Sequence, residues 1–211
     1  YRNFECDDAS TNVTPIAIVI GGEELHNNHH AFPTSAKFSV RWWEFDIGWM
    51  YIFIFRALGL CKVRRVAPKP MIVNSRQVDL KTLQAVLVNR MHVLRDYTSQ
   101  VTMSVFHSER LADRGNELFN KARKLLIMRP QKLDQLALSR LEQILEDNQN
   151  LRTVHELRER LVQIWEQANI SNEGLVAELK AWCAEAEASG IRSLEEFSQR
   201  LRGYMLQPQA I

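Results

Sequence analysis

The chain has 211 residues, with 45% hydrophobic and 25% charged residues, which fits one folded domain or one domain with an extension. Its formal net charge of +2 gives no whole-chain indication of a nucleic-acid partner. Its three cysteines are far apart and form no Cys-x-x-Cys pair, which argues against a disulfide scaffold or a thiolate zinc site.

Two regions of different composition follow each other along the chain. The chain begins at Tyr1 without a signal-peptide pattern, so we expect a truncated or processed start. Residues 1–70 hold three of the five tryptophans and a histidine cluster, whereas residues 71–211 are rich in Leu, Glu, Gln and Arg at helical spacing. The stretch VAPKPMIVNSRQ between them is predicted to be a linker. No segment alternates as a strand would, so the predicted fold class is all-α.

The main chemical signal is a group of histidines in the first region. His26, His29 and His30 fall within an arc of roughly 100° on a helix, so their imidazoles can face one pocket. Neutral imidazole is a good ligand for iron, copper, nickel or zinc. Nearby polar side chains could hold the rings in place, namely Glu23, Glu24, Asn27 and Asn28. Spacing alone indicates transition-metal ligands of unspecified metal, with an exposed polar loop as the alternative.

The segment after the histidines is aromatic and apolar. Asp46 is predicted either to hold a ligand ring or to cap the next helix, and the cap is favoured. The stretch from Ile47 to Leu60 is shorter than the roughly 20 residues that cross a bilayer, and Arg56 interrupts it. We expect it to lie in a membrane interface or to pack against protein.

Helix signals dominate the second region. Asp79 is a predicted helix cap, and Pro130 is predicted to separate two helical segments. Gly190 is predicted to end a helix. Ser193 with Glu196 offers a capping box for the last helix.

The histidines and their flanks together resemble a known family. The block GEELHNNHH-AFP, followed by RWWEFDIGW and LGL-x-x-VRRVAP, resembles the third histidine box and trailing segment of membrane acyl-CoA and acyl-lipid desaturases. The YRNF before the box is similar to the segment that follows the last membrane helix of that family. The resemblance implies that residues 1–70 are the C-terminal cytosolic portion of a di-iron desaturase catalytic domain and that residues 71–211 are a helical extension. It implies His26, His29 and His30 as iron ligands, surrounded by Glu23, Asn27, Asn28 and Asp46.

The resemblance also implies an activity. The complete enzyme would use O2 and a histidine-ligated di-iron centre to introduce a cis double bond, commonly at delta-9, into a fatty acyl-CoA or acyl-lipid. Electrons would come from a reductase through a ferredoxin-like or cytochrome carrier. The complete enzyme would lie at the cytoplasmic face of a bacterial inner membrane, in contact with membrane lipid. The family's two other histidine boxes do not occur in this chain, so we expect the fragment alone to be inactive.

The second region carries a resemblance of its own. A similar extension is typical of proteobacterial desaturases. The stretches RERLVQIWEQ and LVAELKAWCAEAEASGIRSLEEFSQRL are also similar to a helical part of one transposase family, without acidic residues at catalytic spacing. A helical scaffold without nucleic acid is the favoured interpretation. The alternatives are a nucleic-acid-associated, transposase-like module and a non-catalytic metal-binding protein.

Overall fold

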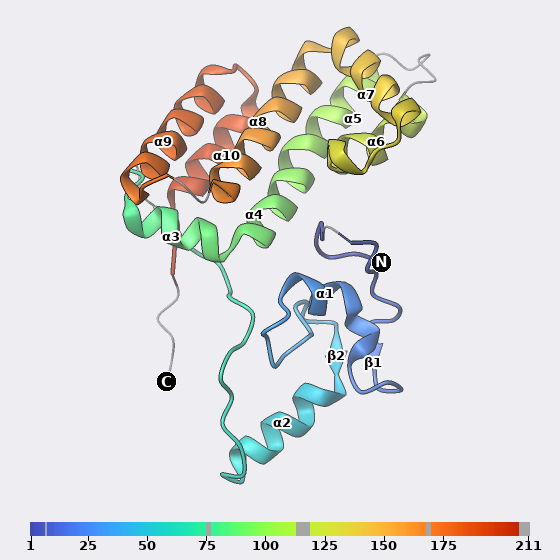
Figure 1. Ribbon diagram of the computed structural model, residues 1–211, viewed down its shortest axis with the longest axis vertical. Coiled ribbons are helices and arrows are strands. Elements are labelled where there is room, and N and C mark those ends of the chain that lie inside the picture. Colours follow the sequence, from blue (N-terminus) through green and yellow to red (C-terminus); the bar gives the residue numbers. More distant parts are fainter. Residues whose placement is uncertain (7, 75–76, 113–118, 168–169, 207–211) are drawn as a thin grey trace. The chain divides into compact units, whose positions relative to one another are not determined.

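The computed structural model describes residues 1–6, 8–74, 77–112, 119–167 and 170–206 (Figure 1). The chain divides into two compact units, Tyr1–Lys69 and Pro70–Ile211. The described residues are mostly helical, which confirms the predicted all-α class. None of the helices in these ranges combines the length and apolarity that crossing a bilayer requires.

The first unit consists of short elements joined by long loops. In chain order these are β1 (Ile16–Ala17), the 3-10 turn η1 (Glu23–Leu25), α1 (His26–Ala31), β2 (Phe45–Asp46) and α2 (Ile47–Ala57). The two strands pair in parallel, with Ile16 opposite Phe45 and Ala17 opposite Asp46. This pairing brings the segment before α1 next to the start of α2.

A polar network, rather than a large apolar core, holds the first unit together. Its members are almost completely buried and belong to segments far apart in sequence: Asn3, Asn12, Asn27, Asn28 and Glu44. Buried amides and carboxylates are tolerated only when they are hydrogen-bonded, so the network fixes the loops that make these contacts.

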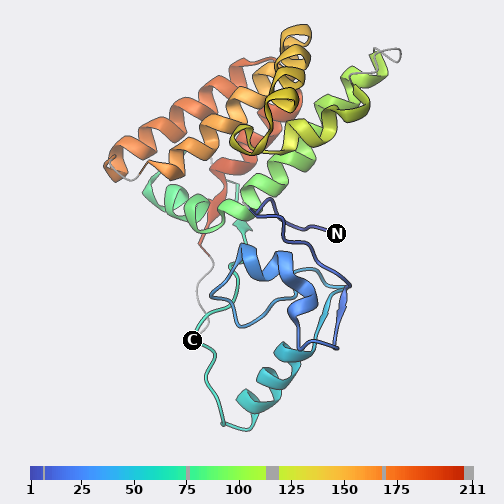
Figure 2. The ribbon, with the colours of Figure 1, turned by 45° about the vertical axis from the view of Figure 1, so that its right-hand side comes forward.

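The second unit is a bundle of helices in which α8, α9 and α10 lie side by side (Figures 1 and 2). Its elements are β3 (Met71–Ile72), α3 (Leu80–Val88), α4 (Arg90–Tyr97), the π-helical turn η2 (Thr98–Thr102), α5 (Met103–Ala112), α6 (Phe119–Ile127), the 3-10 turn η3 (Pro130–Lys132), α7 (Gln135–Asp147), α8 (Gln149–Glu166), α9 (Asn172–Ala188), α10 (Arg192–Arg202) and β4 (Tyr204–Met205). Strands β3 and β4 pair antiparallel, which joins the two ends of this unit.

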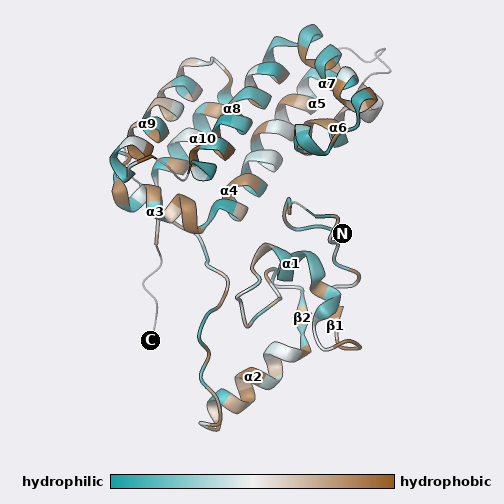
Figure 3. Ribbon diagram, viewed as in Figure 1, coloured by the Kyte–Doolittle hydropathy of each residue, from teal (hydrophilic) through white to brown (hydrophobic). Residues whose placement is uncertain are grey.

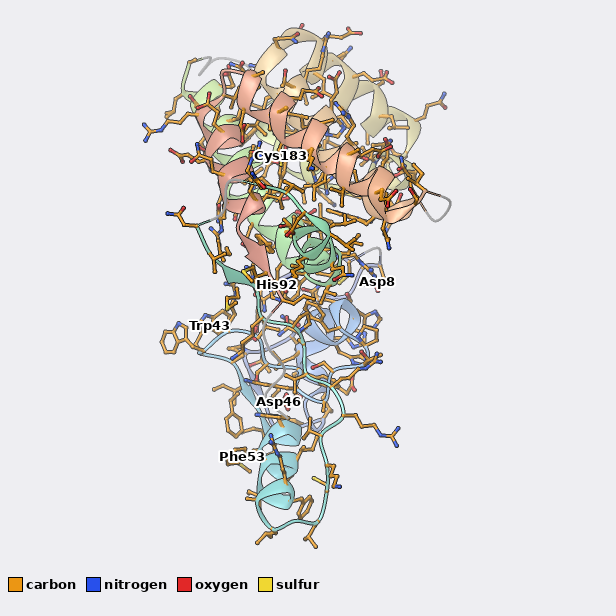
Figure 4. The ribbon with its side chains drawn as sticks, turned by 90° about the vertical axis from the view of Figure 1, so that its left-hand side faces the viewer. Asp8, Trp43, Asp46, Phe53, His92 and Cys183 are labelled. Atoms are coloured by element: carbon orange, nitrogen blue, oxygen red, sulfur yellow. The ribbon has the colours of Figure 1, made fainter. Side chains whose placement is uncertain are left out.

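Aromatic side chains occupy the centre of this bundle. The Tyr97 and Phe197 rings meet edge to face at 5.0 Å, and Trp182 lies 6.1 Å from Phe197. The Tyr97 hydroxyl donates to the Val154 carbonyl at 2.7 Å, and the Trp182 indole N–H donates to the Leu157 carbonyl at 2.8 Å. Each buried polar tip therefore has a partner, as packing of such rings requires. Cys183 is also enclosed here (Figure 4), and burial raises the pKa of its thiol.

Most predicted helix boundaries of this unit are confirmed. Asp79 accepts a hydrogen bond from the Thr82 amide at 2.8 Å, Pro130 lies between α6 and α7, and Gly190 follows α9 with a φ of 69°. The predicted capping box is wrong, because α10 begins at Arg192 and Ser193 lies inside its first turn. The Ser193 hydroxyl is therefore too far along the helix to cap it, and it is buried without a hydrogen-bond partner.

Candidate metal centre

Helix α1 brings the three predicted ligand side chains together. The ring centres of His26 and His30 are 4.2 Å apart, those of His29 and His30 are 5.7 Å apart, and those of His26 and His29 are 6.4 Å apart. Gly21 and Gly22, at φ values of 72° and 109°, form the turn that precedes this helix. The three imidazoles thus form one cluster on a short helix.

Two of the rings face carboxylates through their Nδ1 atoms. His30 Nδ1 lies 2.5 Å from Asp8 Oδ2, and His26 Nδ1 lies 3.5 Å from Glu23 Oε2. His29 packs against Phe38, with ring centres 4.6 Å apart, and its Nδ1 is buried without a hydrogen-bond partner. A buried imidazole nitrogen without a partner is costly, and a bound metal ion would satisfy such an atom.

The amides of Asn27 and Asn28 make their hydrogen bonds on other sides of α1. Asn27 Oδ1 accepts from the backbone N–H groups of Asn3 and Phe4 at 2.8 and 2.9 Å. Asn28 Nδ2 donates to Glu44 Oε2 at 3.0 Å. These contacts anchor α1 to the N-terminal segment and to the loop before β2, so both residues position the helix that carries the histidines.

Asp46 makes the contacts of a helix cap. Its carboxylate accepts from the backbone N–H groups of Phe38 at 2.7 Å, Ser39 at 3.2 Å and Trp49 at 2.9 Å. The cap interpretation favoured from the sequence therefore describes these contacts, and Figure 4 shows Asp46 at the start of α2. Glu24, just before α1, caps no helix and instead accepts from backbone N–H groups of the preceding loop, including that of Val19 at 2.6 Å.

Glu44 is the charged centre of the polar network. Burial raises its pKa, but the N–H groups of Arg41 and Val40 and the side chains of Tyr1 and Asn28 donate to its carboxylate and outweigh that effect. The pKa of Glu44 therefore lies below its ordinary value. An ionised Glu44 holds α1 in place without touching the histidines.

The sequence reasoning missed Asp8, although this residue makes the shortest contact to the histidine cluster. It lies in the N-terminal segment, 22 residues before His30. The sequence shows two adjacent aspartates shortly after YRNF, but no spacing rule relates them to α1.

Within the described residues, no group of three or more His, Cys, Asp or Glu side chains is arranged to hold a metal ion.

Helix α2 presents an apolar surface. None of its residues is buried, and Tyr51, Phe53 and Phe55 are 52%, 60% and 47% exposed. The apolar colouring of α2 in Figure 3 and the position of Phe53 in Figure 4 show this surface. Residues 47–69 carry basic side chains and no acidic ones.

Comparison with known proteins shows similarity to desaturases over part of the chain. It is 42% identical over 69 residues to the sn-1 stearoyl-lipid 9-desaturase of Anabaena variabilis, covering 33% of this chain and 25% of that protein. It is 45% identical over 62 residues to the sn-2 palmitoyl-lipid 9-desaturase of Nostoc sp. (strain 36), covering 29% and 22%. It is 47% identical over 57 residues to the Delta-9 desaturase-like 2 protein of Arabidopsis thaliana, covering 27% and 19%.

These similarities support the desaturase family, and with it an oxidoreductase of lipid metabolism, for about a third of the chain. The chain spans about a quarter or less of the length of these relatives. The remaining part has a different match: a family model described as transposase covers residues 81–207. Because that match spans more than half of the chain, the chain belongs to this transposase family through its second unit. No solved structure matches the chain.

Proposed function

We propose that the first unit supplies one part of the di-iron site of a fatty acyl desaturase, with His26, His29 and His30 as ligands. The complete enzyme introduces a cis double bond, at delta-9, into the saturated chain of an acyl-CoA or acyl-lipid. The observation that carries the proposal is the cluster of three imidazoles on α1, one of which has a buried Nδ1 without a partner. The similarity to delta-9 desaturases supports it.

The residues of this chain bind and orient, while bound iron supplies the activation of O2 that attack on an unactivated C–H bond requires. Imidazole suits iron as a ligand, so the donor set fits. Asp8 lies within hydrogen-bond distance of His30 Nδ1, which leaves Nε2 of that ring to bind metal, whereas Glu23 lies 3.5 Å from His26 Nδ1 and holds that ring less firmly. Asn27 and Asn28 hold α1 through their buried amides. The other ligands come from outside this chain, so the chain alone gives no turnover.

A membrane surface is the proposed location. The exposed aromatic side chains of α2 and the basic residues that follow it suit the interface of an anionic bilayer, which for the complete enzyme is the cytoplasmic face of a bacterial inner membrane. Electrons come from a reductase through a ferredoxin-like or cytochrome carrier. Flotation with vesicles of phosphatidylglycerol tests this location: the chain is expected to float, and Phe53→Asp is expected to remain at the bottom.

A graft tests the proposed activity. This chain would replace the matching segment of the Anabaena variabilis enzyme, in a host that cannot make unsaturated fatty acids. We expect the chimera to form a monoene, His29→Ala to abolish it, and the exposed His107→Ala to have no effect. Monoene formation by the His29→Ala chimera would contradict the ligand assignment. Monoene formation by this chain alone would contradict the need for further ligands.

The family match of the second unit favours a second candidate, a nucleic-acid-associated module. Against it stands the pairing of arginines with carboxylates, as in Arg129 with Glu166, Arg160 with Glu185 and Arg202 with Glu187. Phosphate binding depends on cations that are available to the nucleic acid. We therefore favour a scaffold and expect no saturable binding of fluorescent duplex DNA at physiological salt. Binding that weakens steeply with added salt would support the second candidate.

A further inference from the structure

One contact of the histidine cluster joins segments far apart in the chain. Asp8 Oδ2 lies 2.5 Å from His30 Nδ1, and the other carboxylate oxygen of Asp8 accepts from the Ser10 amide at 2.9 Å. The Arg2 guanidinium donates to the carbonyls of Cys6 and Asp8 at 3.0 and 3.1 Å. Side-chain and backbone contacts therefore hold the Asp8 carboxylate toward His30, and Figure 4 shows Asp8 in the N-terminal segment near α1.

We propose that Asp8 is a positioning residue of the metal centre, which keeps the proton of His30 on Nδ1 and so makes Nε2 the metal-binding atom. The inference rests on the proposed function and adds to it a residue that acts through a ligand. A neutral imidazole carries one ring proton, and a carboxylate beside Nδ1 requires that proton to be there. The lone pair of Nε2 is then available, and a carboxylate partner raises the basicity of the ligand.

The three histidines differ in this respect. His26 Nδ1 lies 3.5 Å from Glu23 Oε2, which is longer than a good hydrogen bond between an imidazole and a carboxylate. His29 Nδ1 has no hydrogen-bond partner. The Asp8–His30 contact alone among these three rings is short enough for a charge-assisted hydrogen bond. The side chains of His30 and Asp8 are 35% and 46% exposed, and a pair this exposed contributes little to folding. Loss of the Asp8 carboxylate is therefore expected to change the tautomer of the His30 ring and to weaken its metal binding, while the fold persists.

The ring tautomer gives the first test, in the metal-free chain labelled with 15N. Long-range proton–nitrogen correlations at about pH 8, above the ordinary histidine pKa of about 6.5, identify the protonated nitrogen. We expect His30 to be protonated at Nδ1 in the wild type, to shift to Nε2 in Asp8→Ala, and to return to Nδ1 in Asp8→Glu. Unchanged amide spectra elsewhere show that the variants are folded. A wild-type His30 protonated at Nε2 overturns the proposal.

Metal affinity gives the second test, by calorimetric titration with Co²⁺. Removing such a carboxylate partner weakens metal binding by roughly 10-fold to 100-fold, which is the loss expected for Asp8→Ala. Asp8→Glu is expected to recover most of it, and Glu173→Gln, which removes an exposed charge from the first turn of α9, to match the wild type. In a His30→Ala background, Asp8→Ala should have no further effect, because the two residues act as one unit.

The outcomes separate the two proposals. Equal Co²⁺ affinity of Asp8→Ala and wild type, or an equal loss in the His30→Ala background, overturns the role of Asp8. A wild-type chain that binds no Co²⁺ contradicts only the expectation that these histidines bind metal without the remaining ligands. The His29→Ala chimera then decides the metal centre, and the tautomer of His30 decides whether Asp8 holds the ring.

Discussion

Replacing Glu44 with glutamine tests the polar network that holds the histidine helix. Five donors converge on this carboxylate: the Tyr1 hydroxyl at 2.8 Å, the amide groups of Asn3 and Asn28 at 2.5 and 3.0 Å, and the backbone N–H groups of Val40 and Arg41 at 2.7 and 2.8 Å. Glutamine offers one oxygen and one NH2 group to the same five donors. At least one buried donor must therefore face another donor.

The expected cost follows from this mismatch. If the oxygen of the introduced glutamine faces the backbone N–H groups, its NH2 group faces Asn3 Nδ2, which cannot turn away because it also donates to Asn28 Oδ1 at 2.8 Å. One unsatisfied buried donor costs about 1–3 kcal/mol, and the remaining bonds lose their charge-assisted strength. Relief from burying a charge offsets part of this loss. We expect the free energy of unfolding of the first unit to fall by about 2–4 kcal/mol.

Hydrogen exchange measured by mass spectrometry reports this unit separately from the second. Peptides that cover α1 are expected to lose protection in Glu44→Gln, while peptides from α8 and α9 keep theirs. Glu23→Gln, which removes a half-exposed carboxylate beside α1, is the matched control and should change stability by less than about 0.5 kcal/mol. Because the pKa of Glu44 is lowered on folding, its contribution is present above the unfolded pKa of about 4.3 and is lost as pH falls through the folded value. Wild-type protection of α1 in Glu44→Gln at neutral pH would refute this reasoning.

Three further predictions concern the second unit. Burial, reinforced by the Arg158 charge, lowers the pKa of His155 to about 4. The contribution of His155 to the free energy of unfolding is therefore complete above about pH 6.5 and should decline by about 3 kcal/mol as the pH falls to about 4. Urea unfolding at stepped pH would show this decline, and an equal decline in His155→Gln would contradict it. Trp182→Ala removes a fully buried ring and its hydrogen bond to the Leu157 carbonyl, and should lower the free energy of unfolding by about 3–5 kcal/mol, measured by chemical unfolding. A loss below about 1 kcal/mol would argue against the central position of this ring. Asp79→Ala removes the cap of α3 and should lower the free energy of unfolding by about 1 kcal/mol, whereas Asp79→Asn should stay close to wild type. Equal losses of stability in both variants would show that the charge of Asp79, rather than its capping hydrogen bond, stabilises α3.

Several features could be predicted because they depend on local sequence. Helical spacing in the second region, the Asp79 cap and the break at Pro130 each involve residues within a turn or two of one another. The gathering of His26, His29 and His30 on one side of α1 follows from the helical repeat. The same repeat places Asn27 and Asn28 roughly 60° or more outside the arc of the histidines. Their contacts away from the rings could therefore have been inferred from the sequence.

Tertiary structure decided which partner each polar side chain meets. Asp8 reaches His30 across 22 residues, and Glu44 reaches Tyr1 across 43 residues, and no local pattern specifies either contact. Asp46 caps α2 through the nearby Trp49 amide, which is a local contact, but its hydrogen bonds from Phe38 and Ser39 depend on how the preceding loop folds. The sequence by itself identified His26, His29 and His30 as candidate metal ligands, because ligand chemistry and helical spacing are local. The surroundings of those residues depend on how the loops close, and loop closure is set by the buried polar network as a whole.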